Sequence, residues 1–182
     1  VATCRTDERA ATQASVDALA ARIWQRRADY VYRSEPLADS LRRAQALAEG
    51  ADRPVLLLDH GDNCMSGGTC DTMDVLQTAL ELGLSGIAVG PLCDPEAVAS
   101  LTAAGEGAAV EIALGNKVSL ERIGLHKQPL RLRGTVRAVS DGAYTVSGPI
   151  YTGQRCQMGR TVCLDTGAAQ IVITEQTHEP WD

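Results

Sequence analysis

A polar segment between two apolar ones is the clearest sign of chemistry in this sequence. Residues 56–76 read LLLDHGDNCMSGGTCDTMDVL and combine carboxylates, a histidine, a glycine pair and hydroxyl residues. Carboxylates and imidazole transfer protons and bind metal ions, so the first half of the segment could take part in hydrolysis. We therefore select Asp59, His60 and Asp62 as candidate catalytic residues. Asp59 and His60 could face the same ion only after a turn, which Gly61 would permit.

The second half of the segment could bind a substrate or an anion. It leads into a predicted helix at 72–82, and the exposed backbone N–H groups at a helix start attract negative charge. Acids at one end and glycines at the other would suit a zwitterionic or metal-bound substrate. The candidate binding residues are Asn63, Gly67, Gly68, Thr69, Asp71 and Thr72.

Ordinary structural roles remain open for the same residues. Asp59, Asp62 and Asn63 could cap turns, Thr69 or Asp71 could cap the helix, and His60 could be a hydrogen-bonded structural histidine. The glycine pair has neither the P-loop spacing nor the dinucleotide-binding spacing. Cys64 and Cys70 flank it without a neighbouring base, which disfavours a nucleophilic thiol.

The elements that would position this segment alternate between helix and strand. Apolar periodicity and capping signals predict helices at 7–30, 36–48, 72–82 and 94–105, and buried strands at 54–58, 86–89 and 108–114. Such alternation predicts parallel strands joined by crossovers. The three strands should then be neighbours, with Asp59 and Gly90 at one edge of the sheet and Gly90 and Pro91 as the second wall of the site.

The pattern changes after Gly115. Residues 116–129 are polar and irregular, and a period of two follows, with Leu130, Leu132, Val136 and Ala138 predicted inward and Arg131, Arg133 and Arg137 outward. Further strands are expected at 143–147, 161–165 and 170–174. The predicted fold class is α/β, a βαβαβ parallel or mixed sheet core with flanking helices and a C-terminal antiparallel β subdomain. Residues 1–128 would form the α/β part and 129–182 the β-rich part packed on it.

Composition narrows the function classes. The 182 residues are 45% hydrophobic and 22% charged, with a net charge of −6 and no clustered Lys and Arg, so nucleic acid is not an expected partner. No apolar run approaches the roughly 20 residues of a membrane-spanning helix. The six cysteines contain no C-x-x-C pair, which argues against a structural zinc site. A soluble cytoplasmic protein with reduced thiols is expected.

Several motifs in order resemble one known family. PVLLLDHGDN, the glycine-rich turn with CDT, GIAVGPLCDPEAV, VRAVSDGAYTVSGPIYTG, MGRTVCLDTG and the closing EPWD are similar to the C-terminal domain of the MlrC family of microcystinase-C-like metallopeptidases. The resemblance spans essentially the whole chain. It implies a longer protein in which a preceding N-terminal domain holds the zinc ligands, and a small peptide or amide as substrate.

The resemblance transfers to individual residues unevenly. Asp59, His60, Asp62 and Asn63 match the family's D-H-x-D-N element, and Gly67, Gly68, Asp71 and Thr72 match its glycine-rich continuation. Cys64 stands where relatives tend to have proline. Gly115, Asn116 and Lys117 resemble the family's G-G-K turn, where Lys117 could meet a substrate carboxylate or could be a solvated lysine.

The leading functional hypothesis is a C-terminal domain of a zinc-dependent peptidase or amidohydrolase. This domain would add residues 59–72 to a cleft whose metal ligands lie in the preceding domain, and the isolated chain would be inactive. No metal ligand is assigned within the chain, because three scattered histidines do not make a ligand set. One alternative is a non-catalytic scaffold, serving assembly or small-anion binding. Another is an autonomous hydrolase that uses Asp59, His60 and Asp62 around a metal.

Overall fold

The chain consists of two compact units, each described here by itself. The computed structural model describes residues 2–179 and 181, and the units are Val1–Pro36 and Leu37–Asp182. Of the closing motif, Pro180 and Asp182 lie outside the described residues. Among the described helices, none has both the length and the apolar character needed to cross a bilayer.

The first unit is a single long helix with short turns at its ends. It comprises η1 (Thr6–Glu8), α1 (Arg9–Gln25) and η2 (Arg27–Tyr30), so the predicted helix is confirmed. None of the side chains described in this unit is buried, so its apolar residues cover no core within the unit. Leu19, Ile23 and Trp24 are all exposed. The Arg27 guanidinium lies over the Trp24 ring, 4.6 Å from its centroid, and Trp24 is still 69% exposed.

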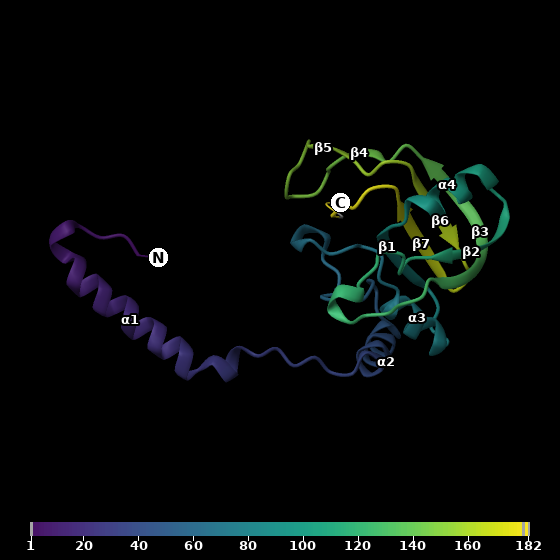
Figure 1. Cartoon of the computed structure of the whole chain (residues 1–182). Coiled ribbons are helices and arrows are strands. Elements are labelled where there is room, and N and C mark those ends of the chain that lie inside the picture. Colours follow the sequence, from purple (N-terminus) through teal and green to yellow (C-terminus); the bar gives the residue numbers. More distant parts are fainter. Residues whose placement is uncertain (1, 180, 182) are drawn as a thin grey trace. The chain divides into compact units, whose positions relative to one another are not determined.

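The second unit is built on a mixed five-stranded sheet (Figure 1). Its order is β1-β7-β6-β3-β2, in which β1 and β7 are parallel and all other neighbours antiparallel, and β4 and β5 form a separate pair. The predicted α/β class, with flanking helices and an antiparallel part, is confirmed. The elements are α2 (Leu37–Ala48), η3 (Cys64–Ser66), α3 (Asp74–Glu81), β1 (Ile87–Cys93), α4 (Pro95–Ala104), β2 (Ala109–Leu114), η4 (Glu121–Ile123), β3 (Leu130–Ser140), β4 (Ala143–Thr145), β5 (Arg155–Gln157), β6 (Thr161–Asp165) and β7 (Ala169–Thr174).

The core lies between one face of this sheet and the helices α3 and α4. α4 packs against β2, β3, β6 and β7, and α2 packs on α3 through the buried Leu41. Strands from both sides of residue 128 share the sheet, so the two predicted parts of the chain have one core. The largest fully buried core side chains are Met73, Leu101, Leu114, Leu164, Ile171 and Ile173.

Local signals fix the ends of α4 as predicted. The carboxylate of Asp94 accepts the N–H of Ala97 at 3.0 Å, and Pro95 occupies the first turn. Gly105 ends the helix with φ +84°, a conformation that costs glycine little.

A bulge in β3 changes which side chains face the core. The register with β6 shifts between Val136 and Ala138, so Val139 rather than Ala138 packs against the core. The predicted inward position of Ala138 is therefore wrong, because an extra residue in a bulge reverses the alternation beyond it. The arginines at 131, 133 and 137 are exposed, as predicted.

The predicted trio of neighbouring parallel strands is wrong. Residues 54–58 are not part of any sheet, and β1 and β2 occupy opposite edges of the sheet with β7, β6 and β3 between them. The pairings also make β1 and β2 run in opposite directions. An apolar run indicates burial of a strand but specifies neither its neighbour nor its direction.

The predicted second wall at Gly90 and Pro91 is also wrong, because both residues lie inside β1. A Cβ at Gly90 would lie 2.7 Å from the carbonyl oxygen of Val172, so the strand passes close to β7 there. The end of β1 is instead Cys93, whose N–H donates to the carbonyl of Cys70 at 2.8 Å. This bond joins the strand end to the segment that the sequence singled out.

Candidate functional site

Asp62 organises the loop formed by residues 59–72, called the 59–72 loop below. Its two carboxylate oxygens accept the backbone N–H groups of Cys70 at 2.8 Å, Asp71 at 2.8 Å and Thr72 at 3.0 Å, and the hydroxyl of Thr69 at 3.3 Å. The N–H groups that the sequence assigned to a substrate anion are thus directed at a carboxylate of the chain itself. The loop therefore does form a cluster of N–H donors for an anion, and that anion is the Asp62 carboxylate.

These contacts change the acidity of Asp62. Burial by itself would raise the pKa of this carboxyl, but the N–H groups of Thr72, Cys70 and Asp71 and the Thr69 hydroxyl outweigh burial and lower it. Asp62 is therefore charged at neutral pH. It holds the loop as an anion.

Gly67 and Gly68 allow the loop to fold closely around the Asp62 carboxylate. Gly67 has φ +87° and ends η3, whose start is capped by the Asn63 side chain accepting the N–H of Ser66 at 3.1 Å. At Gly68, a Cβ would lie 2.5 Å from an oxygen of Asp62 and 2.7 Å from the carbonyl oxygen of Asn63. A side chain would thus push the loop away from Asp62. The alternative role of Asn63 as a local cap is present in the structure.

Asp59 and His60 lie on the outside of the loop. Both are exposed, and the Asp59 carboxylate accepts the N–H of Gly61 at 2.7 Å in a local turn. The structure thus separates the three predicted catalytic residues into an exposed pair and the inward-directed Asp62. Within residues 2–179 and 181, no group of three or more His, Cys, Asp or Glu side chains is placed to hold a metal ion. The described residues of this chain therefore do not fit a zinc site.

Asp71 ties the loop to a distant turn. Its side chain is buried and accepts the N–H groups of Lys117 at 2.8 Å and Val118 at 2.9 Å, and its carbonyl accepts the N–H of Asn116 at 2.6 Å. Asn116 returns the contact, because its side chain accepts the N–H of Met73 at 3.2 Å. Asp71 therefore holds the 115–118 turn and does not cap α3.

Asp94 anchors the same turn from the other side. Beyond capping α4, its carboxylate accepts the N–H of Gly115 at 3.0 Å and the Lys117 ammonium at 3.0 Å. Lys117 also pairs with Glu96 at 3.2 Å and is three-quarters covered, so it is neither a solvated lysine nor an open partner for a substrate carboxylate. We call Asp62, Asp71 and Asp94, with the groups they accept from, the carboxylate network. The capping signals in the sequence predicted that the helix α4 starts at residue 94, but they did not indicate these longer contacts.

Three thiols surround the network in protonated form. Burial, then the neighbouring Cys64 and Asp62, raise the pKa of Cys70 to about 12. Burial also raises the pKa of Cys64, whose sulfur lies 3.2 Å from a carboxylate oxygen of Glu179, and that of Cys93. These thiols are poor nucleophiles at neutral pH. All six cysteines are free thiols.

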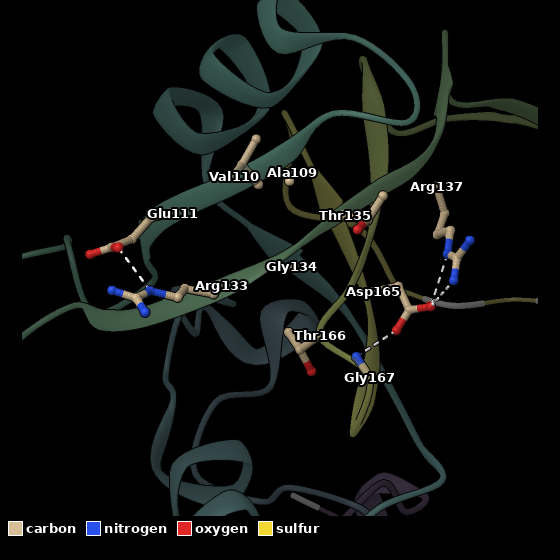
Figure 2. A pocket seen from close by; sticks show the side chains of 10 residues that line it. All are labelled: Ala109, Val110, Glu111, Arg133, Gly134, Thr135, Arg137, Asp165, Thr166 and Gly167. Carbon is tan, nitrogen blue, oxygen red and sulfur yellow. Dashed lines mark hydrogen bonds and ion pairs between the residues drawn. The ribbon is translucent and has the colours of Figure 1, made fainter.

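Two hollows in the described structure are possible ligand sites. The larger, about 620 Å³, lies over β2, β3 and β6 and contains none of the candidate catalytic or binding residues selected from the sequence. Figure 2 shows that Arg133 and Arg137 there turn to Glu111 and Asp165, at 3.0 Å and 2.8 Å, so their charges are compensated. The smaller, about 220 Å³, lies against Asp71 and Lys117 and the following 118–128 segment. The candidate site is thus the surface beside the carboxylate network.

Comparison with known proteins decides the family. The family model described as MlrC C-terminus matches residues 57–182, more than half of the chain. The chain belongs to the MlrC family. Microcystinase C from a Sphingomonas species is 33% identical over 122 residues, which are 67% of this chain and 22% of that protein. The crystal structure of a proposed metallopeptidase from Mesorhizobium sp. BNC1 is similar with a TM-score of 0.72 and 27% identity, over 86% of this chain and 30% of that one.

The MlrC match includes the whole carboxylate network. It begins two residues before Asp59 and continues through the 115–118 turn. Helices α1 and α2 precede the matched range. This MlrC C-terminal domain spans less than a third of either longer relative.

Replacing Asp62 should destabilise the domain more than replacing Asp59. Asp62→Asn puts an amide nitrogen where an oxygen now accepts N–H groups, so we expect a loss of about 2 kcal/mol in the free energy of unfolding at pH 7. Asp59→Asn keeps an oxygen for one exposed N–H and should cost under about 0.5 kcal/mol. Urea unfolding followed by circular dichroism measures both.

The effect of Asp62 should also depend on pH. Its pKa is lowered on folding, so its stabilisation is complete above the unfolded-state value of about 3.9 and is lost as pH falls through the lower folded-state value. The stability gap between wild type and Asp62→Asn should therefore narrow below about pH 4. Equal losses for the two variants, or a gap that widens in acid, would contradict the role given to Asp62.

Gly115→Ala should be far more damaging than the matched change Gly124→Ala. Both glycines have positive φ, +62° and +74°, so both variants incur backbone strain of roughly 1–2 kcal/mol. At Gly115 the new methyl would also meet the Asp71 carbonyl oxygen at 2.5 Å and the Met73 side chain, whereas at Gly124 no described atom lies within 4 Å. We expect an additional loss of about 1–3 kcal/mol at Gly115. Equal unfolding midpoints for the two variants would refute this packing.

Proposed function

We propose that this MlrC C-terminal domain completes the substrate cleft of a zinc-dependent peptidase or amidohydrolase. The metal ligands would lie in a preceding domain of the same polypeptide, and the 59–72 loop would form part of the cleft. The observation that supports the proposal is the arrangement of the loop, which is anchored from inside by Asp62 and presents Asp59 and His60 outward.

The three predicted catalytic residues then have different roles. His60 could exchange a proton with a substrate, and the Asp59 carboxylate could bind a substrate ammonium, because both side chains are exposed. Asp62 is a positioning residue, since its oxygens are occupied by the loop backbone. Asn63, Gly67, Gly68, Thr69, Asp71 and Thr72 would act by holding the shape of the loop against the substrate.

The proposed substrate is a small peptide or amide. This class agrees with the names of the two relatives, a microcystinase and a proposed metallopeptidase. We also propose a cytoplasmic location, because a reducing compartment keeps free thiols such as these six reduced.

One observation favours a second candidate, a non-catalytic scaffold. The carboxylate network accounts for Asp62, Asp71 and the glycines through architecture alone. If the preceding domain held every group that contacts the substrate, this domain would serve assembly only. His60 distinguishes the two candidates, because its exposed imidazole could take part in catalysis and is not needed by a scaffold.

The deciding experiment uses the longer polypeptide that contains this chain. His60→Gln should lower turnover of short linear peptides at least about tenfold, while the metal content and the unfolding midpoint stay at wild-type values. Asp141→Asn, in the exposed turn between β3 and β4, is the control and should keep wild-type turnover. Chelation of the metal should abolish turnover.

Wild-type turnover in His60→Gln would instead support the scaffold. Turnover that survives complete metal removal would contradict a metal-dependent hydrolase. Metal content is measured by mass spectrometry on the same samples, so a lost metal cannot be mistaken for a lost side chain.

A further inference from the structure

The segment Pro54 to Leu58 has strand character without a strand partner. It reads PVLLL, an apolar run typical of a buried strand, yet Leu56 and Leu58 are 80% and 73% exposed. Leu57 between them is 46% exposed and Val55 is half-buried. The exposure alternates with the period of two that an extended chain imposes. Leu56 and Leu58, on one side of the segment, are thus more exposed than Val55 and Leu57 on the other.

The backbone of this segment also lacks hydrogen bonds to the described main chain. Among the residues that the structure describes, residues 54–58 make no hydrogen bond to another main-chain group. Burying a leucine side chain is favourable, and contiguous exposed apolar residues mark interaction sites. Exposed leucines beside N–H and C=O groups that pair with no other described main-chain group suit the edge of another sheet.

The comparisons indicate what covers the segment. The MlrC C-terminal match begins at residue 57, inside the segment, and the two relatives are more than three times as long as the part they share with this chain. The segment therefore lies at the start of the matched MlrC C-terminal range. The occupant with the highest effective concentration at this position is the preceding part of the same polypeptide.

We propose that residues 55–58 add as a strand to a sheet edge of the preceding domain, with Leu56 and Leu58 buried in that domain. The inference rests on the proposed function only in requiring the longer polypeptide. Asp59 follows Leu58 directly, so strand pairing would fix the start of the 59–72 loop against the preceding domain. Asp62 anchors the same loop to this domain, and the loop would thus be held from both sides.

Hydrogen exchange tests the pairing directly. In the longer polypeptide, the amides of Leu56–Asp59 should exchange at least about 100-fold more slowly than in the 182-residue chain. The 182-residue chain should show fast exchange of these amides at both low and high protein concentration. Fast exchange in the longer polypeptide would overturn the inference. Protection in the 182-residue chain that grows with concentration would also overturn it, because the occupant would then be a second copy.

A charged variant links the protection to the two leucines. The double change Leu56→Lys and Leu58→Lys in the longer polypeptide should restore fast exchange at these amides and leave the amides of the β1–β7 pair protected. Ile150→Lys, at another exposed apolar residue, is the matched control and should change neither. A double variant that keeps slow exchange at Leu56–Asp59 would overturn the role of the leucines.

The readout needs no substrate, so it separates the two proposals. Slow exchange in a longer polypeptide that hydrolyses nothing would support the docking strand and contradict the proposed function. Hydrolysis with fast exchange would contradict the docking strand alone.

Discussion

Asp71 and Asp94 are almost wholly buried, and the loops around them must supply their hydrogen bonds. A buried carboxylate without partners would cost several kcal/mol, so the shapes of these loops are tied to the two charges. The Asp94 carboxylate accepts the N–H groups of Ala97 and Gly115 and the Lys117 ammonium. The Asp71 carboxylate accepts the N–H groups of Lys117 and Val118 in the same turn. The helix α4, the strand end at Leu114 and the 59–72 loop are held together in this way.

This constraint explains why a polar segment interrupts two apolar ones. The 59–72 loop consists mostly of polar residues and glycines, so apolar packing contributes little to its shape. Its shape is held by four groups that donate hydrogen bonds to the Asp62 carboxylate. A loop fixed from within can present its outer side chains in a defined geometry, which binding and catalysis require. The sheet contributes by placing the end of β1 at Cys93 against Cys70. Architecture and the proposed chemistry therefore use opposite sides of one loop.

Local features could be predicted from the sequence, and long-range ones could not. The cap at Asp94 joins residues three apart, and β6 was predicted with its observed bounds, because both follow from local patterns. The Asp94 contacts to Gly115 and Lys117 span 21 and 23 residues, and no local pattern encodes them. The predicted strand order was wrong for the same reason, because strand pairing also joins distant parts of the chain. The PVLLL run was predicted as a buried strand, but residues 54–58 belong to no sheet and Leu56 and Leu58 are exposed.

A double-mutant cycle on Asp71→Ala and Asp94→Ala tests the carboxylate network most directly. The two carboxylates bind adjacent parts of the 115–118 turn, so the loss of either should weaken the hold of the other. The predicted coupling free energy from urea unfolding exceeds about 0.5 kcal/mol. The control cycle pairs Asp71→Ala with Asp165→Ala, whose carboxylate contacts Arg137 and Gly167, and should be additive within about 0.5 kcal/mol. Additive losses for Asp71 and Asp94 would contradict a shared network.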